Sequence, residues 1–253
     1  MDQGNTAFVL ISAALVLLMT PGLAFFYGGM VKAKSVVSMM MLSFGSLGLI
    51  GVLWVLYGYA IAFSNGGSKT FIGIDGWFGI DTSFIGLNAQ VADALDPQGA
   101  YPSLAFVAFQ ATFAIITVAL ISGAIADRAK FGAWMVFAGI WATIVYFPVA
   151  NWVFNFTLDK GKVVDGGWIV NNLGVIDFAG GTAVHINAGA AGLALAIVLG
   201  KRFGFSKGIT QPHNVPLTLL GTALLWFGWF GFNAGSALEA NGTAALAFVN
   251  TWL

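Results

Sequence analysis

The sequence predicts an all-α, polytopic membrane protein, a bundle of helices that cross a bilayer. Three observations support this fold class. Of 253 residues, 58% are hydrophobic and only 8% are charged, against roughly 45–50% and about 25% in soluble domains. Six charge-free apolar stretches are each about as long as the ~20 residues that a spanning helix needs. The 34 glycines suit helices that approach one another closely through small side chains.

The expected spans follow in chain order. They are residues 6–27, 35–63, 101–126, 131–149, 178–200 and 216–238. The start, MDQGNTAF, lacks the basic segment of a cleavable signal peptide, so the first span is expected to stay in the mature protein. Another apolar run begins at Ala240, and its roughly fourteen residues are too few to span, so we expect a seventh helix that is cut off. Residues 1–253 are then the N-terminal part of a single transmembrane domain without a separate soluble domain.

The basic residues predict the orientation, because cytoplasmic loops are enriched in Lys and Arg. The loops that follow the first, third and fifth spans lie on one side of the membrane. This set holds Lys32, Lys34, Arg128, Lys130, Lys201, Arg202 and Lys207. The other set holds Lys69, Lys160 and Lys162, with Asp2, Asp75, Asp81, Asp93, Asp96, Asp159, Asp165 and Glu239. The first set is therefore expected in the cytoplasm and the N-terminus outside, with residues 64–100 forming an external loop or cap.

The charge and cysteine counts exclude several classes of ligand. The net charge is zero, which removes any electrostatic case for binding nucleic acid. The chain has no cysteine, so neither disulfides nor thiolate metal sites are available. We expect no metal and no cofactor.

Asp177 lies where the fifth span is expected to enter from outside. Aspartate is a preferred N-cap, because its carboxylate accepts hydrogen bonds from the first free amide groups of a helix. The same negative charge would also lower the energy of a cation that waits at the outer mouth. The two roles are compatible, so Asp177 is both a predicted cap and a predicted site residue.

His185 follows eight residues later, roughly 12 Å deeper along a helix. Ionisable residues near the middle of a membrane usually face the bundle interior and mark a substrate or proton path, although a structural hydrogen bond is the alternative. Gly181 and Gly189 lie four residues to either side, with Ala188 and Gly192 on the same face. This stripe of small residues either admits a neighbouring helix or leaves room for a small solute.

Aromatic residues gather at the expected external ends of two other spans. Trp229, Phe232 and Ser236 are spaced three and four apart, so they share one face of the sixth span. Phe109 and Phe113 form a similar pair in the third span. Each pair alone would fit a packing stripe. Together with an acid outside and an imidazole deeper in, they indicate a pore that collects a small cation through aromatic faces and then removes its water.

Several stretches carry a family resemblance. They are MTPGLAFFYGGMV, FQATFAIITVALISGAIADR, DFAGGTAVHINAGAAGL, GKRFGFSKG, PHNVPL and WFGFNAGSA. The chain resembles a bacterial member of the Amt/Mep/Rh ammonium transporter family, in the family's order and over essentially the whole sequence. The resemblance implies an eleven-helix fold of two inverted five-helix repeats, here with the first repeat complete and the second truncated. It also implies a homotrimer in the cell membrane with one pore per subunit.

The resemblance assigns a role to each motif residue. Phe113 and Phe232 resemble the family's stacked phenyl gate, and Ser236 the hydroxyl of its outer ammonium site. Asp177 matches the acid that organises this site, and His185 the first of two pore histidines. The second belongs to the tenth helix, which this chain does not reach.

Three further assignments complete the predicted site. Trp229 matches a residue that lies next to the phenyl gate in the family, and Phe26 matches an aromatic residue that lines the pore. The family's outer-site tryptophan aligns with Phe154, which is a departure, because tryptophan binds cations more strongly than phenylalanine. Trp152 or Trp168 is the alternative for that role.

The resemblance implies nitrogen uptake: ammonium is recruited outside, and ammonia, with or without the proton, passes the pore. An ammonium sensor with the same fold is the alternative, and a cytoplasmic PII-type protein is the implied partner. A haem-binding electron carrier would need paired histidines on facing spans, and an intramembrane hydrolase would need a nucleophile and a base. Only one histidine, His185, lies within a span, since His213 lies in a loop, and Asp177 is the sole acid expected to be buried. We therefore expect no enzyme.

Overall fold

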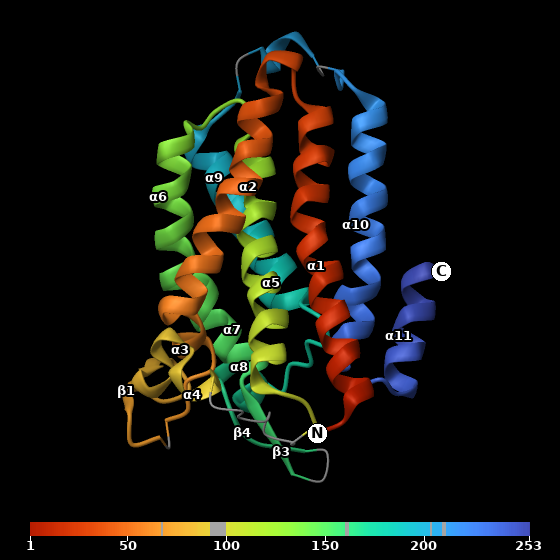
Figure 1. Cartoon of the computed structure of the whole chain (residues 1–253). Helices are drawn as coiled ribbons and strands as arrows, with labels where there is room; N and C mark the ends of the chain where they lie inside the picture. The colour runs from red at the N-terminus through yellow and green to blue at the C-terminus, as the bar shows by residue number, and fades with distance from the viewer. Residues whose placement is uncertain (67, 92–99, 160–161, 203, 209–210) are drawn as a thin grey trace.

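The computed structural model describes residues 1–66, 68–91, 100–159, 162–202, 204–208 and 211–253. Six apolar helical segments run alongside one another between two ends of the molecule (Figure 1). Each is long and apolar enough to cross a membrane, and they span Gln3–Met30, Ala33–Ala62, Ser103–Ile125, Phe131–Phe154, Gly181–Leu199 and Val215–Gly235. These segments confirm the six expected spans.

Several spans consist of more than one helix. The second joins η1 (Ala33–Ser35), α2 (Val36–Leu53), η2 (Trp54–Gly58) and α3 (Tyr59–Ala62). The third joins α5 (Ser103–Ile121) and η4 (Ser122–Ile125), and the fourth joins α6 (Phe131–Trp141), η5 (Ala142–Tyr146) and α7 (Phe147–Phe154). The fifth joins η6 (Gly181–Ile186) and α9 (Asn187–Leu199).

The elements η2, η5 and η6 are single π-helical turns. Such turns often mark functional sites, and η6 contains His185. Uninterrupted helices form the first and sixth spans, which are α1 (Gln3–Met30) and α10 (Val215–Gly235). A shorter helix, α11 (Gly242–Trp252), follows α10, as expected from the apolar run after Ala240.

Two antiparallel hairpins and short helices cover the end of the bundle that carries the N-terminus (Figure 1). One hairpin pairs β1 (Phe71–Ile74) with β2 (Phe78–Asp81), so that Phe71 lies opposite Asp81. The other pairs β3 (Phe156–Asp159) with β4 (Lys162–Gly166). The short helices at this end are η3 (Thr82–Leu87), α4 (Asn88–Val91) and α8 (Trp168–Asn172).

The described residues of the predicted loop or cap at 64–100 lie at this hairpin end. No spanning helix forms in that part, as expected. Asp93, Asp96 and Lys160, counted above with the external loops, lie outside the described residues. The links between the first and second, third and fourth, and fifth and sixth spans meet at the opposite end, where η7 (Phe205–Lys207) also lies.

Asp81 fixes the first hairpin. Its side chain is buried, and its Oδ1 accepts hydrogen bonds from the Thr70 hydroxyl, the Ser83 hydroxyl at 2.7 Å and the Ser83 amide at 3.0 Å. Burial alone would raise the pKa of Asp81, but hydrogen bonds from Thr70, Ser83 and Ser68 outweigh that effect and lower the pKa below its ordinary value. A charged carboxylate whose Oδ1 accepts three hydrogen bonds thus ties β2 to the chain before β1.

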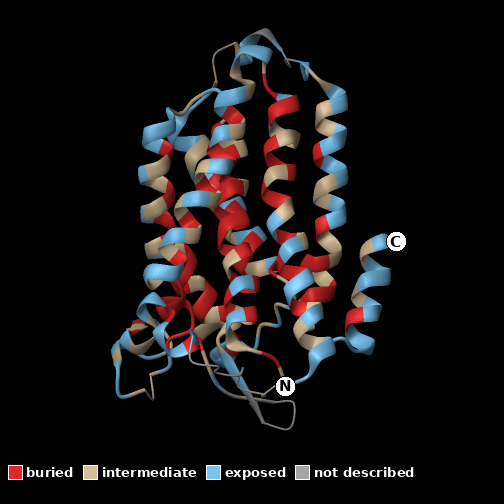
Figure 2. Ribbon diagram, in the orientation of Figure 1, coloured by how far each residue is buried: buried red, intermediate tan, exposed pale blue. Residues whose placement is uncertain are grey.

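The third span forms the centre of the bundle. In the most apolar 18-residue stretch of this span, 72% of the residues are buried, against 22% in the corresponding stretches of the fifth and sixth spans. Figure 2 shows the buried residues concentrated on α1, α5 and the inner faces around them. The fifth and sixth spans therefore touch the rest of this chain through narrow faces.

Glycine explains how α10 packs against α1. A row of glycines, called the glycine seam below, lies between them: Gly22 and Gly29 on α1, and Gly221, Gly228, Gly231 and Gly235 on α10. A Cβ atom at Gly221 would lie 2.6 Å from the Gly22 carbonyl oxygen and closer still to the Phe26 amide nitrogen. The backbones are therefore in direct contact, which is the small-residue packing expected from the composition.

Gly221→Ala should disrupt the seam. The added methyl group meets the backbone of α1, which cannot yield without moving the helix, so we expect the free energy of unfolding to fall by about 1–3 kcal/mol. The midpoint of thermal unfolding in detergent measures this. Gly132→Ala on α6 is the matched control, because its Cβ would meet nothing within 4 Å. A Gly221→Ala midpoint equal to that of the control would contradict the seam.

Candidate functional site

Asp177 forms a more extensive cap than a single N-cap bond. Its Oδ1 accepts hydrogen bonds from the amides of Gly180 and Gly181 at 2.6 and 2.9 Å. Its Oδ2 accepts from the amides of Thr182 and Ala183 at 2.8 and 2.9 Å. The predicted cap is confirmed, and the carboxylate also places negative charge at the positive end of the helix dipole.

The fifth span begins later than expected. Its first helical residue is Gly181 rather than residue 178, because Gly180 takes a φ of 114° that interrupts the helix. A side chain at Gly180 would also meet Val184 at 2.8 Å and the Phe232 ring at 3.2 Å. The chain before the helix is therefore non-helical, and the carboxylate of Asp177 reaches forward to the amides of the first turn.

His185 occupies the π-helical turn η6. Its backbone amide donates to the Gly180 carbonyl oxygen at 3.0 Å, five residues earlier, and its ring Nδ1 lies 3.1 Å from the same oxygen. A carbonyl oxygen only accepts, so Nδ1 must carry a hydrogen. The imidazole stacks on Trp229 with ring centroids 5.8 Å apart, and meets Phe232 edge-on at the same distance. The structural hydrogen bond foreseen for His185 is present, and in the neutral ring Nε2 is then the acceptor.

The stripe of small residues around His185 divides into two parts. An added Cβ at Gly181 or Gly189 would meet nothing within 4 Å of this chain. Ala188 and Gly192 are buried, and a Cβ at Gly192 would lie 3.2 Å from the Ala124 Cβ in the third span. Close packing of the stripe is therefore present at Gly192, whereas Gly181 and Gly189 are exposed on this chain, and room for a solute beside them stays a prediction.

A cavity of about 190 Å³ lies beside the imidazole. It is lined by Met19, Leu23, Phe26, Tyr27, Ile116, Leu120, His185, Leu225, Trp229 and Phe232. Four of the predicted site residues are thus brought together: Phe26, His185, Trp229 and Phe232. The Tyr27 hydroxyl donates to the Leu120 carbonyl oxygen at 3.0 Å, which leaves the imidazole as the main polar group beside an apolar wall.

Phe232 lines this cavity, and its ring packs on that of Phe113. Their ring centroids are 4.4 Å apart with planes 33° apart, and the side chains are only 1% and 2% exposed. Phe109 packs edge-on against Phe113 at 4.8 Å. The two rings predicted to stack are therefore in contact, in a tilted arrangement, and no open passage separates them.

Ser236 and Phe154 lie on the hairpin side of this pair. The Ser236 hydroxyl donates to the Phe232 carbonyl oxygen at 2.7 Å, so its lone pairs remain to accept from another donor. Phe154, at the end of α7, meets Phe113 edge-on at 6.3 Å. The residue aligned with the family's tryptophan is thus next to the stacked pair.

Trp152 and Trp168 belong instead to a separate cluster. Trp77 stacks on Trp168 at 5.0 Å, and Trp152 meets both rings edge-on, at 6.2 Å from Trp77 and 5.7 Å from Trp168. The Trp152 indole also donates to the Trp77 carbonyl oxygen. These indoles join the first hairpin to α7 and α8, which favours Phe154 for the aromatic role.

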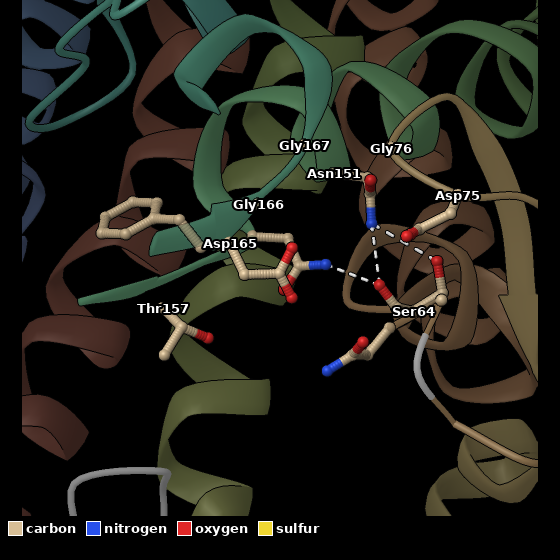
Figure 3. A pocket seen from close by; sticks show the side chains of 12 residues that line it. Ser64, Asp75, Gly76, Asn151, Thr157, Asp165, Gly166 and Gly167 are labelled. Atoms are coloured by element: carbon tan, nitrogen blue, oxygen red, sulfur yellow. Dashed lines mark hydrogen bonds between the residues drawn. The ribbon is translucent and has the colours of Figure 1, made fainter. Parts of the chain in front are cut away.

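A second, polar pocket of about 20 Å³ lies within the hairpin end. Figure 3 shows Asp75 and Asp165 approaching it from two sides, around the hydrogen bonds between Asn151 and Ser64. Asn155 also donates to the Ser64 carbonyl oxygen, at 2.6 Å. The volume suits about one water molecule. This pocket joins the end of the second span to both hairpins and shares no residue with the cavity beside His185.

The aliphatic residues that line the His185 cavity were not identified from the sequence. Met19 and Leu23, Ile116 and Leu120, and Leu225 with Trp229 are each four residues apart. That spacing places each pair on one helix face. It would have found these residues once the inner face of each span was known, but the spans are apolar all round.

The fold and cavity define a polytopic membrane protein with a largely apolar cavity of solute size beside an imidazole. The chain matches the Ammonium Transporter Family over residues 7–253 and belongs to that family. It is 58% identical over 257 residues to the ammonium transporter of Mycobacterium tuberculosis (strain ATCC 25618 / H37Rv), covering 99% of this chain and 54% of that protein. For the ammonium transporter of Bacillus subtilis (strain 168) the identity is 49% over 251 residues, with 99% and 57% covered.

Solved structures agree with this membership. Mep2 of Candida albicans has a TM-score of 0.81 and 32% identity, over 99% of this chain and 52% of that one. A protein described as a Sensor Amt Protein has a TM-score of 0.82 and 30% identity, over 98% of this chain and 58% of that one. The predicted all-α ammonium-transporter fold is confirmed. The chain spans little more than half the length of the curated relatives it matches.

Proposed function

We propose that this protein is an ammonium transporter or channel of the cell membrane, which recruits ammonium outside and conducts ammonia past His185. One observation carries the proposal: Phe232, which packs on the buried ring of Phe113, lines an apolar cavity whose main polar group is the imidazole of His185. Membership of the Ammonium Transporter Family and the names of the relatives support the substrate.

Recruitment takes place on the hairpin side of the stacked pair. Ser236 offers an acceptor oxygen, because its own hydrogen is donated to the Phe232 carbonyl. The faces of Phe113 and Phe154 attract a cation, and the charge of Asp177 adds to the attraction. Asp177 acts at a distance, since four backbone amides already bind its two oxygens.

Desolvation then selects the neutral amine. An unpaired cation is costly in an apolar cavity, whereas ammonia can pass at a much lower cost. In the neutral imidazole Nδ1 faces the Gly180 carbonyl, so Nε2 is free to accept a hydrogen bond from ammonia. The proton either stays outside or follows along a separate step. In the second case transport is electrogenic and a current measures it, and in the first case the uptake of ammonium into proteoliposomes takes the place of the current.

The assembly and orientation follow the resemblance. The protein is a multi-pass homotrimer with one pore per subunit and an external N-terminus. The loops rich in Lys and Arg face the cytoplasm, where a PII-type signalling protein docks. The N-terminus lies at the hairpin end, and the links that hold most of the Lys and Arg residues lie at the opposite end (Figure 1).

An ammonium sensor is the second candidate. The favouring observation is the TM-score of 0.82 with the protein described as a Sensor Amt Protein. A sensor would bind ammonium at the same outer site with little flux, so measurements of binding and of current on the same preparation separate the two functions.

His185→Ala should lower the ammonium current about tenfold. The substitution removes the one ring acceptor in the cavity, and a lost hydrogen bond of about 1–1.5 kcal/mol corresponds to roughly that factor. Proteoliposomes on a solid-supported membrane give the current. His213→Ala is the matched control, because His213 lies in a loop, with Nδ1 2.9 Å from the Val31 carbonyl oxygen. Wild-type current and selectivity in His185→Ala would show that the imidazole only packs.

Phe154→Trp should tighten the apparent affinity for ammonium. An indole face binds a cation more strongly, by about 1 kcal/mol or less at an exposed site, which is up to about fivefold. The half-saturating ammonium concentration of the current measures it. Phe156→Trp, on β3 and 40% exposed, controls for an added indole elsewhere on the hairpin end. Weaker or unchanged affinity in Phe154→Trp would count against this residue as part of the outer site.

A further inference from the structure

A third cavity, of about 290 Å³, lies at the end of the bundle opposite the hairpins. It is formed by the link between the first and second spans and the link between the third and fourth. Its lining consists of Lys32, Lys34, Ser35, Ser38, Met39, Leu42, Ile125, Asp127 and Ala129. None of these residues lines the cavity beside His185, so the two are separate.

The mouth of this cavity is cationic. Lys32 and Lys34 flank the start of η1, and the hydroxyls of Ser35 and Ser38 follow within two turns. Among the described residues that line the cavity, Asp127 is the only acid, so two ammonium groups lie near one carboxylate. Within the described part of the chain, neither lysine nor Asp127 forms an ion pair. An anion that enters would therefore displace no internal partner.

The floor of the cavity is apolar. Met39 and Leu42 on α2 and Ile125 on η4 are each only 3% exposed. The cavity thus combines a basic, hydroxyl-lined mouth at the ends of two spans with an aliphatic surface that leads inward. A free inorganic anion would use only the mouth. A phospholipid would use both, because its phosphate meets the cations while its glycerol and first methylene groups meet the floor.

We propose that this cavity binds the head group of an anionic phospholipid. The phosphate lies between Lys32 and Lys34 and accepts hydrogen bonds from Ser35 and Ser38. Basic pockets between helices at a membrane surface bind such head groups, at about 1 kcal/mol for each Lys or Arg. Bound lipid would join the two links, and the proposal does not depend on what the pore conducts.

Native mass spectrometry of the full-length protein in detergent tests the proposal, with phosphatidylglycerol as the probe. We expect the double variant Lys32→Gln, Lys34→Gln to bind the first lipid about twentyfold more weakly, since about 1 kcal/mol for each lysine is roughly fivefold. Lys130→Gln is the matched control, because Lys130 is exposed at the same end, outside the lining. Equal lipid affinity in the double variant and this control would overturn the proposal.

Asp127→Asn provides the opposite change. Asp127 has a φ of 62°, a conformation that asparagine also adopts readily, so the backbone should be retained. Loss of the carboxylate should tighten phosphatidylglycerol binding about fivefold, which a variant that merely unfolds cannot do. Weaker binding in Asp127→Asn would contradict the charge argument.

Two competing ligands distinguish an anionic lipid head group from a neutral lipid and from a free anion. Phosphatidylcholine should bind more weakly than phosphatidylglycerol, and inorganic phosphate at millimolar concentration should leave the lipid bound. Equal binding of phosphatidylcholine would remove the requirement for an anionic head group. Displacement of the lipid by inorganic phosphate would assign the site to a free anion instead.

Discussion

The position of α10 depends on the direct contact of two backbones along the glycine seam. Because Gly221, Gly228 and Gly231 carry no side chain, α10 lies close enough to α1 for Trp229 and Phe232 to reach the cavity beside His185. A bulkier seam would move these rings outward. The seam is therefore as much a part of the site as the rings themselves, although none of its glycines lines the cavity.

The chain before the fifth span adds the second constraint. Asp177 binds four successive amides, and Gly180 supplies the left-handed turn that makes this geometry possible. The Gly180 carbonyl in turn orients the imidazole of His185. One acid, one glycine and one histidine thus form a connected unit, in which the cap sets the helix start and the helix start sets the direction of the ring.

The spans and much of the site could be predicted from the sequence, because twenty apolar residues in a row have few other structures available. The cap at Asp177 and the close approach of Phe113 and Phe232 were also accessible, the first from capping chemistry and the second from resemblance. The π-helical turn at His185 was not, since no residue type specifies one. The β hairpins were missed because short, Gly-rich strands such as residues 71–74 show too little alternation. Tyr27 was missed because one aromatic in an apolar helix does not reveal which face is internal.

The contact of Phe113 with Phe232 has a kinetic consequence. With ring centroids 4.4 Å apart and both side chains buried, nothing crosses between them until at least one ring turns aside. Gly180 bounds the space into which Phe232 can turn. Under the proposed function, passage would require discrete side-chain rotations, and its rate and temperature dependence would reflect the packing around the two rings. Each solute molecule would then need its own opening of the ring pair, so the pathway would be gated and not continuously open.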